Sequence, residues 1–388
     1  METITRFLKP PRQSFFLLGP RGTGKTLWTE SSFKDALKID FLEPDTFRLY
    51  SSNPERLKEK LAGSPSTKTV IVDEVQKVPE ILSVIHGLME RNRSLQFVLT
   101  GSSARKLKRS GVDLLAGRAL NKTLHPFMAA EIGKSFDLST SLRRGLLPVV
   151  WGATNPDETL KAYHGLYLRE EIQMEALTRN VGNFGRFLET ISFSHASVLN
   201  LANISRECAV ERKTVEGYLQ ILKDTLLAFE LPVFSKKAKR ETASHPKFYL
   251  FDTGVFRSLR PLGPLDQPEE IEGASLEGLV AQHLVAWNAY RGGSNQISHW
   301  RTRSQVEVDF VVYGEDGLWA FEVKNTKKIR PEDARGLRSF GEDYPRAQLV
   351  LLYRGSETLK KDRILRLPCE SFFSRLHPER NFQAVISA

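Results

Sequence analysis

The stretch Gly19-Pro20-Arg21-Gly22-Thr23-Gly24-Lys25-Thr26 has the spacing G-x-x-x-x-G-K-T and decides how the N-terminal part of the chain is interpreted. The apolar run 14–18 before it is suited to a buried strand, and residues 27–37 after it can form a helix. A glycine-rich loop between a strand and a helix turns backbone N–H groups toward a phosphate chain. We therefore predict that these eight residues bind ATP, with Lys25 at the β- and γ-phosphates and Thr26 as a ligand of Mg²⁺.

A second motif, Thr69-Val70-Ile71-Val72-Asp73-Glu74, is an apolar β-branched run that ends in two acids. At the carboxyl end of a parallel strand, Asp73 would lie beside the glycine loop and hold Mg²⁺ through water. Glu74 is placed to polarise the attacking water as a general base. A helix cap is the alternative for Asp73, and an ordinary glycine-rich turn is the alternative for the loop. The two motifs together, at ordinary spacing, favour ATP hydrolysis over both.

Two further positions are candidates for the same site. The strand predicted at 95–100 stops at Gly101, and Ser102, or Thr100, would sense the γ-phosphate or the attacking water. A helix N-cap is an equally good interpretation of Ser102. Arg118 could reach a neighbouring subunit's nucleotide as an arginine finger, which would suit a ring or a dimer. Positioning the loops of its own domain is an equally good interpretation of Arg118.

Alternating strands and helices in this region predict the α/β class, with a parallel sheet covered by helices on both faces. The chain has 388 residues, which favours two or three domains, and we predict boundaries at 1–135, 136–260 and 261–388. A net charge of +10 favours polyanion partners, nucleic acid first.

The cysteine count and the apolar runs bear on the compartment of the protein. Cys208 and Cys369 are far apart and form no C-x-x-C, which argues against a disulfide framework or a zinc site and fits a reducing cytosol. Neither a signal core nor an apolar run of membrane-spanning length occurs in the sequence, so we expect a cytoplasmic protein without a membrane partner.

The middle of the chain predicts a helix-turn-helix with a wing. Helices are expected just after 197–202 and at 209–222, followed by strands at 226–231 and 247–251. The basic run Lys236–Arg240 between the strands would contact a DNA backbone. A structural lid is an equally good interpretation. The second helix mixes Glu211 and Glu216 with Arg212 and Lys213, which argues against base reading.

The C-terminal part contains acids that interrupt apolar strands. Strands at 306–313 and 318–324 form a hairpin with a turn at 314–317. Asp309 could face Glu322 and Lys324 across it, and Glu277, on an amphipathic helix at 276–284, could add a ligand. Two or three carboxylates with a lysine suit Mg²⁺ binding and phosphodiester hydrolysis, with Lys324 orienting the water or stabilising the developing charge. A surface salt-bridge ladder is the alternative. Burial favours a site, because a buried charge needs a partner.

Taken together, the chain resembles the prokaryotic AAA-type ATPases of the AAA_14 group that carry a C-terminal DUF4143 region. The resemblance rests on residues 19–26, 70–76, 99–103 and 115–118, and further on 249–255, 276–278, 308–310 and 322–324. It implies a P-loop domain followed by a winged-helix domain and an α/β domain similar to the PD-(D/E)xK nucleases. In that domain it implies Asp309, Glu322 and Lys324 as metal and catalytic positions, with Glu277 as an accessory acid.

Three functions are compatible with these motifs. The first is a Mg²⁺-dependent ATPase that acts on DNA. The second is a metal-dependent DNA nuclease that ATP regulates. The third is a non-catalytic interaction protein that uses ATP as a switch. The basic charge balance favours the first two.

Overall fold

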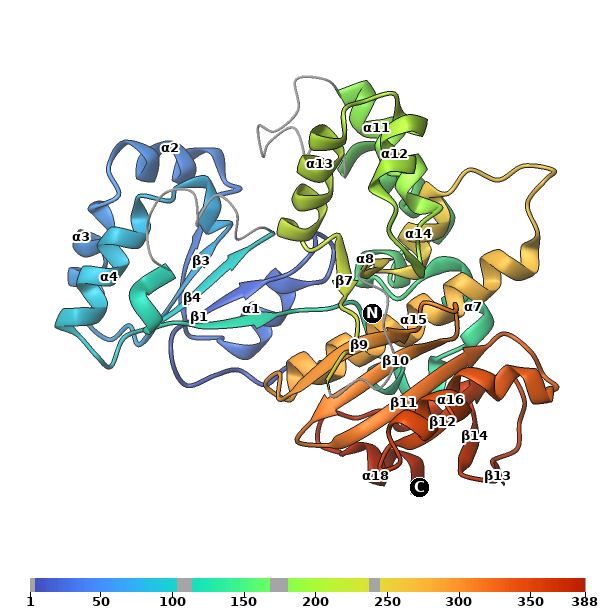
Figure 1. The fold of residues 1–388 in the computed structure, drawn as a ribbon. Coiled ribbons are helices and arrows are strands. Elements are labelled where there is room, and N and C mark those ends of the chain that lie inside the picture. The colour runs from blue at the N-terminus through green and yellow to red at the C-terminus, as the bar shows by residue number, and fades with distance from the viewer. Residues whose placement is uncertain (1–3, 103–113, 168–180, 237–244, 388) are drawn as a thin grey trace. The chain divides into compact units, whose positions relative to one another are not determined.

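The computed structural model describes residues 4–102, 114–167, 181–236 and 245–387, which divide into two compact units. One unit comprises Leu8–His125 with Ile221–Leu227. The other comprises Met1–Phe7, Pro126–Gln220 and Ala228–Ala388. Both units mix helices and strands, which confirms the predicted α/β class (Figure 1). The finer division into three domains stays a prediction.

The smaller unit is built on a five-stranded sheet in the order β2-β3-β4-β1-β5, and every pairing in it is parallel. Its strands are β1 (Phe15–Leu18), β2 (Leu37–Asp40), β3 (Thr69–Asp73), β4 (Gln96–Gly101) and β5 (Leu120–Thr123). Its helices are α1 (Lys25–Ser32), α2 (Pro44–Ser52), α3 (Arg56–Ala62) and α4 (Ile81–Arg91), with 3-10 turns η1 (Val75–Lys77) and η2 (Leu114–Gly117). The parallel sheet of the predicted P-loop region is therefore present.

Helices cover both faces of this sheet. Successive strand residues point to opposite faces and pack against different helices. Phe15 packs edge-on against Trp28 of α1, with ring centroids 6.1 Å apart. Its neighbour Phe16 lies in a separate buried cluster with Tyr50 of α2 and Leu57 of α3. Because β1 is covered on both faces, all four of its residues are apolar and buried.

The larger unit contains a six-stranded mixed sheet in the order β13-β14-β12-β11-β10-β9. Its strands are β9 (Asn295–Arg301), β10 (Glu307–Gly314), β11 (Gly317–Lys324), β12 (Gln348–Tyr353), β13 (Leu359–Lys361) and β14 (Ile364–Pro368). Its helices are α15 (Pro268–Tyr290), α16 (Arg335–Asp343), α17 (Cys369–Arg375) and α18 (Phe382–Ser387), with a 3-10 turn η5 (Pro331–Ala334). The predicted hairpin is present as β10 and β11, which pair antiparallel.

The two faces of the six-stranded sheet carry different helices. Phe310 and Phe321 pack with residues of α15 in one buried cluster. Val311 and Ala320, on the opposite face, pack with Leu337 and other residues of α16 in another. We expected an amphipathic helix at 276–284, but every residue from 278 to 284 is buried. The helix is buried on all sides there, Gln282 and His283 included, because other elements of the unit cover the side turned away from the sheet.

The same unit also holds a small antiparallel sheet and the helices around it. The sheet order is β6-β8-β7, with β6 (Ser197–Val198), β7 (Ala228–Leu231) and β8 (Lys247–Leu250). Helices α11 (Val181–Ser192), α12 (Leu201–Cys208), α13 (Arg212–Asp224) and α14 (Thr253–Leu259) accompany it, with the last turn of α13, from Ile221, belonging to the smaller unit. Before them come α6 (Ala129–Ile132), η3 (Gly133–Ser135), α7 (Leu138–Arg144), α8 (Pro148–Trp151), α9 (Pro156–Ala162) and the π-helical turn η4 (Tyr163–Tyr167).

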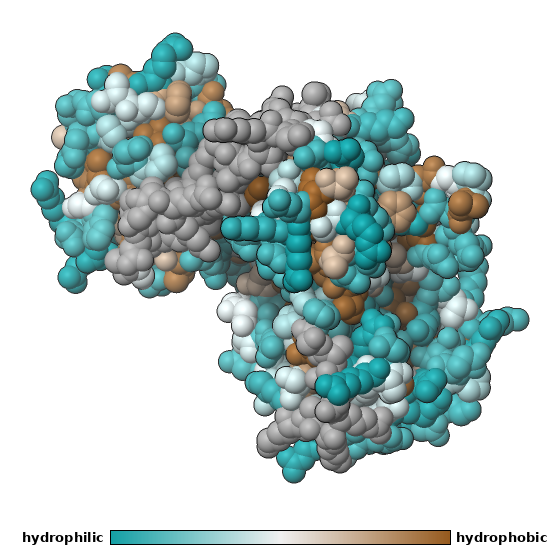
Figure 2. All heavy atoms as spheres, turned by 45° about the horizontal axis from the view of Figure 1, so that its top comes forward, coloured by the Kyte–Doolittle hydropathy of each residue, from teal (hydrophilic) through white to brown (hydrophobic). Residues whose placement is uncertain are grey.

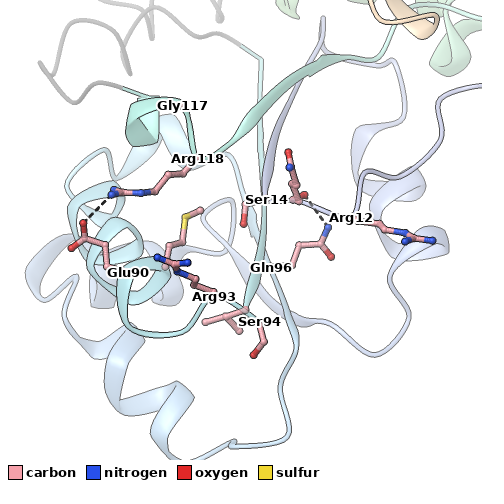
Figure 3. Close-up of a pocket in the computed structure, with 11 residues that line it drawn as sticks. Arg12, Ser14, Glu90, Arg93, Ser94, Gln96, Gly117 and Arg118 are labelled. Carbon is pink, nitrogen blue, oxygen red and sulfur yellow. Dashed lines mark hydrogen bonds and ion pairs between the residues drawn. The ribbon is translucent and has the colours of Figure 1, made fainter.

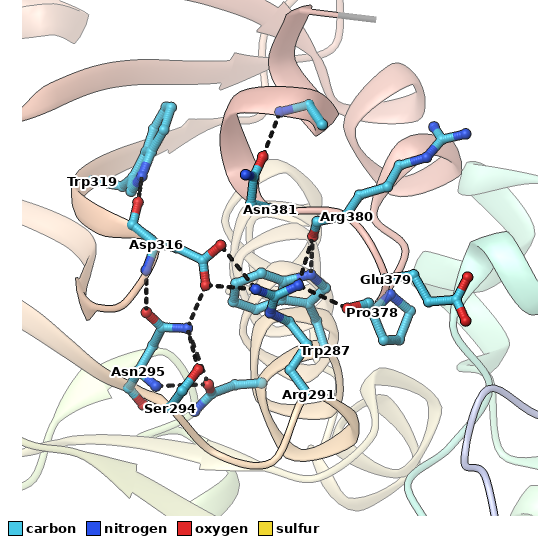
Figure 4. A network of polar contacts seen from close by, with 12 residues as sticks. Trp287, Arg291, Ser294, Asn295, Asp316, Trp319, Pro378, Glu379, Arg380 and Asn381 are labelled. Atoms are coloured by element: carbon cyan, nitrogen blue, oxygen red, sulfur yellow. Dashed lines mark hydrogen bonds and ion pairs between the residues drawn. The ribbon is translucent and has the colours of Figure 1, made fainter.

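A polar network ties the end of α15 to the β10–β11 turn and to the C-terminal segment (Figure 4). Arg291 donates to both carboxylate oxygens of Asp316 at 3.1 Å and to the carbonyl of Pro378 at 2.8 Å. Asn295 donates to Asp316 at 2.8 Å, and the side chain of Asp316 is only 2% exposed. Arg291, Asn295 and Asp316 are each held by at least two bonds, which makes the network a structural clamp.

The surface adds little beyond this arrangement. On the face drawn in Figure 2, hydrophilic residues predominate over hydrophobic ones. Exposed large apolar side chains occur in several parts of the chain, such as Leu27 after the glycine loop and Leu262 and Leu265 between α14 and α15, as is usual for globular proteins. Among the helices that the structure describes, none is long and apolar enough to cross a membrane.

Candidate functional site

The glycine loop between β1 and α1 curls through backbone conformations that suit glycine. Gly24 precedes α1 with φ 84°, in the left-handed region, and a Cβ there would be strained even though no atom lies within 4 Å of its place. Gly19 is limited by contact instead, since a Cβ on it would lie 2.5 Å from the carbonyl oxygen of Leu124. The loop therefore passes close to the chain that follows β5, and α1 begins at Lys25 with its N–H groups directed at the loop.

Lys25 is buried, and its ammonium holds the loop together. Its Nζ donates to the carbonyl of Gly19 at 2.8 Å and to that of Pro20 at 3.2 Å. The hydroxyl of Thr23 donates to the same Pro20 carbonyl at 2.8 Å. A phosphate placed in the curl would compete for this ammonium with two neutral carbonyls, and an anion is the stronger partner for it.

The strand order brings the second motif to the loop. β4 lies between β1 and β3, and all three strands end at the same edge of the parallel sheet. At that edge the hydroxyl of Thr26 donates to Asp73 Oδ2 at 2.9 Å. Asp73 is buried, and a hydroxyl beside a carboxylate is an oxygen pair of the kind that Mg²⁺ accepts. The chemistry of this pair therefore fits a magnesium ion.

Thr100, at the end of β4, fixes the other oxygen of that carboxylate. Its hydroxyl is hydrogen-bonded to Asp73 Oδ1, which also accepts the N–H of Glu74 at 3.1 Å. The N–H of Glu74 lies 3.3 Å from Thr100 Oγ1 as well. Glu74 has φ 56° and ψ 46°, an uncommon conformation for a residue other than glycine, and these bonds stabilise it.

Ser102 lies on the same edge but contacts a different partner. Its hydroxyl accepts a bond from Gln76 Nε2 at 3.2 Å, and Gln76 Nε2 also donates to the carboxylate of Glu74. Of the two sensor candidates, Thr100 contacts Asp73 directly, whereas Ser102 reaches Glu74 through Gln76. Sequence reasoning assigned no role to Gln76. A buried amide two residues after the acidic pair was the signal that could have indicated one.

Arg118 lies at the opposite edge of the sheet from the glycine loop. It precedes β5, whose first residue pairs with Phe15 at the start of β1, whereas the loop follows the end of β1. Arg118 forms an ion pair with Glu90 at 3.1 Å and contacts His86, both on α4 (Figure 3). A cavity of about 580 Å³ lies beside it, lined also by Arg12 and Arg93. From this edge Arg118 does not reach the loop of its own unit.

The acids of the larger unit surround a lysine that sequence reasoning missed. Lys247 of β8 is buried, and its Nζ lies 2.9 Å from Asp309 Oδ1 and 2.7 Å from Glu277 Oε1. Tyr249, also on β8, donates to the same Glu277 oxygen at 2.7 Å. A lysine at the first position of an otherwise apolar buried strand was the available signal. A buried ammonium needs a carboxylate partner, and here it has two.

Glu322 and Lys324 form a separate pair next to this group. Lys324 Nζ lies 2.7 Å from Glu322 Oε1, and the N–H of Val323 donates to Asp309 Oδ2 at 2.9 Å. Phe321 packs with α15, so its neighbour Glu322 points to the other face of the sheet, toward α16. A Cβ on Gly336, at the start of α16, would indeed lie 3.4 Å from Glu322 Oε2.

The buried charges perturb one another. Burial would lower the pKa of Lys247, but the carboxylates of Asp309 and Glu277 outweigh it and hold that pKa well above its usual range. Burial would raise the pKa of Asp309, and the ammonium groups of Lys247 and Lys324 reverse this and lower it. Burial raises the pKa of Glu277 to about 7, and the Asp309 carboxylate adds to the rise. The pKa of Glu322 is also raised, by burial first and by Asp309 second.

These contacts do not gather the acids that we predicted as metal ligands. Glu277 comes from the α15 side of the sheet and Glu322 points to the α16 side, and Lys247 lies against both Glu277 and Asp309. Among the residues that the structure describes, no group of three or more His, Cys, Asp or Glu side chains is arranged to hold a metal ion. Asp309 and Lys324 have different ion-pair partners, and the Lys324 ammonium nonetheless lowers the pKa of Asp309.

The predicted helix-turn-helix region is helical where the structure describes it. Helices α12 and α13 are followed by the antiparallel strands β7 and β8, and β6 completes their sheet. On the exposed side of α13, Arg212 pairs with Glu216 at 3.0 Å. Most of the basic run between β7 and β8 lies outside the described residues. Its first member, Lys236, lies over the ring of Tyr313 at 4.2 Å.

Comparison with known families agrees with the resemblance seen in the sequence. Residues 11–133 match the model of an AAA domain, AAA_14, and residues 272–372 match a domain of unknown function, DUF4143. Residues 135–266, between them, match another domain of unknown function, DUF8612. The predicted combination of an AAA_14 domain with a C-terminal DUF4143 region is confirmed, and the AAA match indicates nucleotide binding at the level of the family.

Similar proteins extend over most of the chain. Uncharacterized protein Rv2008c of Mycobacterium tuberculosis is 28% identical over 372 residues, which are 92% of this chain and 80% of that protein. Uncharacterized protein Mb2031c of Mycobacterium bovis matches with the same values. The crystal structure of protein VC1899 from Vibrio cholerae aligns over 95% of this chain and 98% of that one, at 12% identity and a TM-score of 0.23. A TM-score this low carries no argument.

Proposed function

We propose that the smaller unit binds ATP with Mg²⁺ and hydrolyses it. The observation that carries this proposal is the contact between the Thr26 hydroxyl and the Asp73 carboxylate, 2.9 Å apart beside the glycine loop. Two motifs separated by 42 intervening residues meet there, and each is of the type that one half of a nucleotide site requires. The match of residues 11–133 to an AAA domain supports the same conclusion.

Each residue of the site has a role in this proposal. The loop N–H groups and the Lys25 ammonium bind the phosphate oxygens and orient the γ-phosphate. Thr26 and Asp73 would hold Mg²⁺, which would supply positive charge to neutralise the phosphates. Glu74 accepts a proton from the water whose oxygen attacks the γ-phosphorus, while the bond to the ADP oxygen breaks. The products are ADP and inorganic phosphate.

Thr100, Gln76 and Ser102 act as positioning residues. Thr100 bonds Asp73 and so keeps one carboxylate oxygen turned toward Thr26. Gln76 bonds Glu74 and Ser102 together, so a shift at the end of β4 would move the general base. Replacing Gln76 with alanine should lower kcat more than it changes KM, because ground-state binding of ATP does not involve this residue.

Turnover of ATP tests the proposal. Lys25→Ala should abolish ATP binding, and Glu74→Gln should retain binding but lower kcat by about 10²-fold or more. Lys60→Ala and Glu59→Gln on the exposed side of α3 are matched controls and should behave as the parent does. Hydrolysis by Lys25→Ala at the parental rate would refute the assignment of the loop. Tight ATP binding by the parent without turnover would favour an ATP-switched interaction protein instead.

Arg118 is proposed as a finger that completes the nucleotide site of another copy of the chain. The support is its position at the sheet edge opposite the loop, beside a cavity with two further arginines. The test mixes two inactive variants, Arg118→Ala and Lys25→Ala. A mixed oligomer holds some sites that combine an intact loop with an intact finger, so activity should reappear on mixing. If the mixture remains as inactive as its components, Arg118 does not act between copies.

Action on DNA is a second proposal, favoured by one topological observation. The order α11, β6, α12, α13, β7, β8 is that of a winged helix, with α13 in the place of the recognition helix. The net charge of +10 supports a polyanion partner. Fluorescence anisotropy with a labelled DNA duplex tests it. Lys213→Ala on α13 should weaken binding and reduce its salt dependence, whereas Lys360→Ala on β13 should not. Equal binding by both variants would refute a role for α13.

A further inference from the structure

The group of Lys247, Glu277 and Asp309 has the form of a cation site whose cation is a side chain. Two carboxylates from different elements, α15 and β10, lie 2.7 Å and 2.9 Å from one buried nitrogen. The remaining oxygen of Asp309 accepts the backbone N–H of Val323. Tyr249 donates to the Glu277 oxygen that also contacts the ammonium. The oxygens that a divalent ion would need are thus already engaged by donors.

The strand pairing of Lys247 fixes the position of its ammonium. Residue 247 pairs with Val198 of β6 on one side and with Leu231 of β7 on the other. The segment after β7 is attached to β9, because Phe234 donates its N–H to the carbonyl of His299 at 2.7 Å. Lys247 therefore lies on the central strand of the small sheet, at the place where that sheet joins the six-stranded sheet. Its side chain is 4% exposed, so it cannot turn into solvent without opening that joint.

The charges are already nearly balanced without a metal. The three carboxylates Glu277, Asp309 and Glu322 face two ammonium groups, those of Lys247 and Lys324. One buried oxygen, Glu322 Oε2, has no hydrogen-bond partner among the described residues, and it lies on the α16 side of the sheet. A single oxygen is not a site for a hard divalent ion, which needs about six oxygen ligands. The residues present therefore do not fit the predicted metal.

We propose that the Lys247 ammonium occupies the position where the sequence motifs predict a divalent metal. The larger unit is therefore not a metal-dependent nuclease. In this role the ammonium joins β8 to α15 and β10, and the acids serve as its counter-ions. The predicted metal ligands are then structural. This inference is independent of ATP hydrolysis, since every residue in it belongs to the larger unit.

Mn²⁺ binding to the full-length chain tests the inference, followed by the loss of the free-ion signal in electron paramagnetic resonance. All proteins carry Asp73→Asn, so that the nucleotide site contributes no binding. With Lys247 in place we expect no binding that depends on Asp309. Lys247→Met vacates the cation position, and we expect it to bind about one Mn²⁺ at millimolar concentration. Adding Asp309→Asn to that variant should abolish the gain.

Two variants keep the test decisive. Lys247→Arg preserves the positive charge and should gain no Mn²⁺ binding. Lys247→Gln removes the charge but keeps a hydrogen-bond donor, and it replaces the methionine variant if that one does not fold. Mn²⁺ binding by the protein with Lys247 intact, lost on Asp309→Asn, would overturn the proposal. So would a folded Lys247→Met protein that binds no Mn²⁺, because the ammonium would then not occupy a cation site.

Discussion

Replacing Lys247 with methionine should destabilise the larger unit by roughly 3–5 kcal/mol. Methionine keeps most of the side chain's apolar length but removes the ammonium between Asp309 and Glu277. At an effective dielectric constant of about 20, one ion pair of this length is worth roughly 6 kcal/mol before desolvation is subtracted. The net cost is smaller because burial of the ammonium carries a desolvation penalty that methionine does not have, and because Glu277 can take up a proton when the ammonium is lost.

Thermal unfolding followed by tryptophan fluorescence measures this cost. Four of the five tryptophans lie in the larger unit, so the signal reports mainly on it. At about 2 °C per kcal/mol, the expected loss corresponds to a fall in Tm of roughly 6–10 °C. Lys360→Met, on an exposed strand, is the matched control and should leave Tm unchanged. The double variant Lys247→Met, Glu277→Gln should recover part of the loss, because one of the two opposed carboxylates is gone.

A fall in Tm of less than about 2 °C for Lys247→Met would refute the reasoning, since it would mean that the ammonium contributes less than roughly 1 kcal/mol. Failure of the double variant to recover any stability would refute it in another way. The carboxylates would then not be the groups that depend on Lys247.

Three further outcomes follow from other parts of the structure. His283 is buried with both ring nitrogens engaged, and burial lowers its pKa to about 4 from an unfolded value of 6.5. The stability that this histidine contributes is present above pH 6.5 and is lost as the pH falls toward 4, so His283→Gln should flatten the acid side of a stability-versus-pH curve by up to about 3 kcal/mol. Asp316→Asn removes the charge that Arg291 binds through two 3.1 Å contacts, and urea unfolding should show a loss of roughly 2–3 kcal/mol; no loss would mean that the network is not a clamp. Gly19→Ala places a Cβ 2.5 Å from the Leu124 carbonyl oxygen, and calorimetry should show ATP affinity reduced about tenfold or more, with unchanged affinity counting against the loop geometry.

The elements that sequence reasoning placed best are those with strong local signals. The strand predicted at residues 318–324 is β11, Gly317–Lys324, to within one residue, because a mostly apolar run that follows a turn has one simple interpretation. The hairpin at β10 and β11 was marked by its turn in the same way. The helix carrying Glu277 was harder, since burial on all sides depends on which elements cover it. Periodicity within the helix does not contain that information.

For the candidate sites, too, the sequence predicted what local motifs encode, and the strand order decided the rest. The sequence predicted Thr26 and Asp73 as partners because a glycine loop and an acid-tipped strand have a known spatial relation in parallel sheets. It left Thr100 and Ser102 as alternatives, because only the strand order β1-β4-β3 shows which hydroxyl lies against Asp73. The place of Arg118 at the opposite edge likewise follows from the pairing of β5 with β1.

The sequence by itself determined that a glycine loop follows a buried strand and that acids interrupt apolar strands, because both are local patterns of residue type and spacing. Only the tertiary structure decided what the acids face. Lys247 lies 62 residues before Asp309, on a strand of a different sheet, and no local pattern connects the two. Which charge neutralises a buried carboxylate depends on which distant element is packed against it, and that is a property of the folded chain.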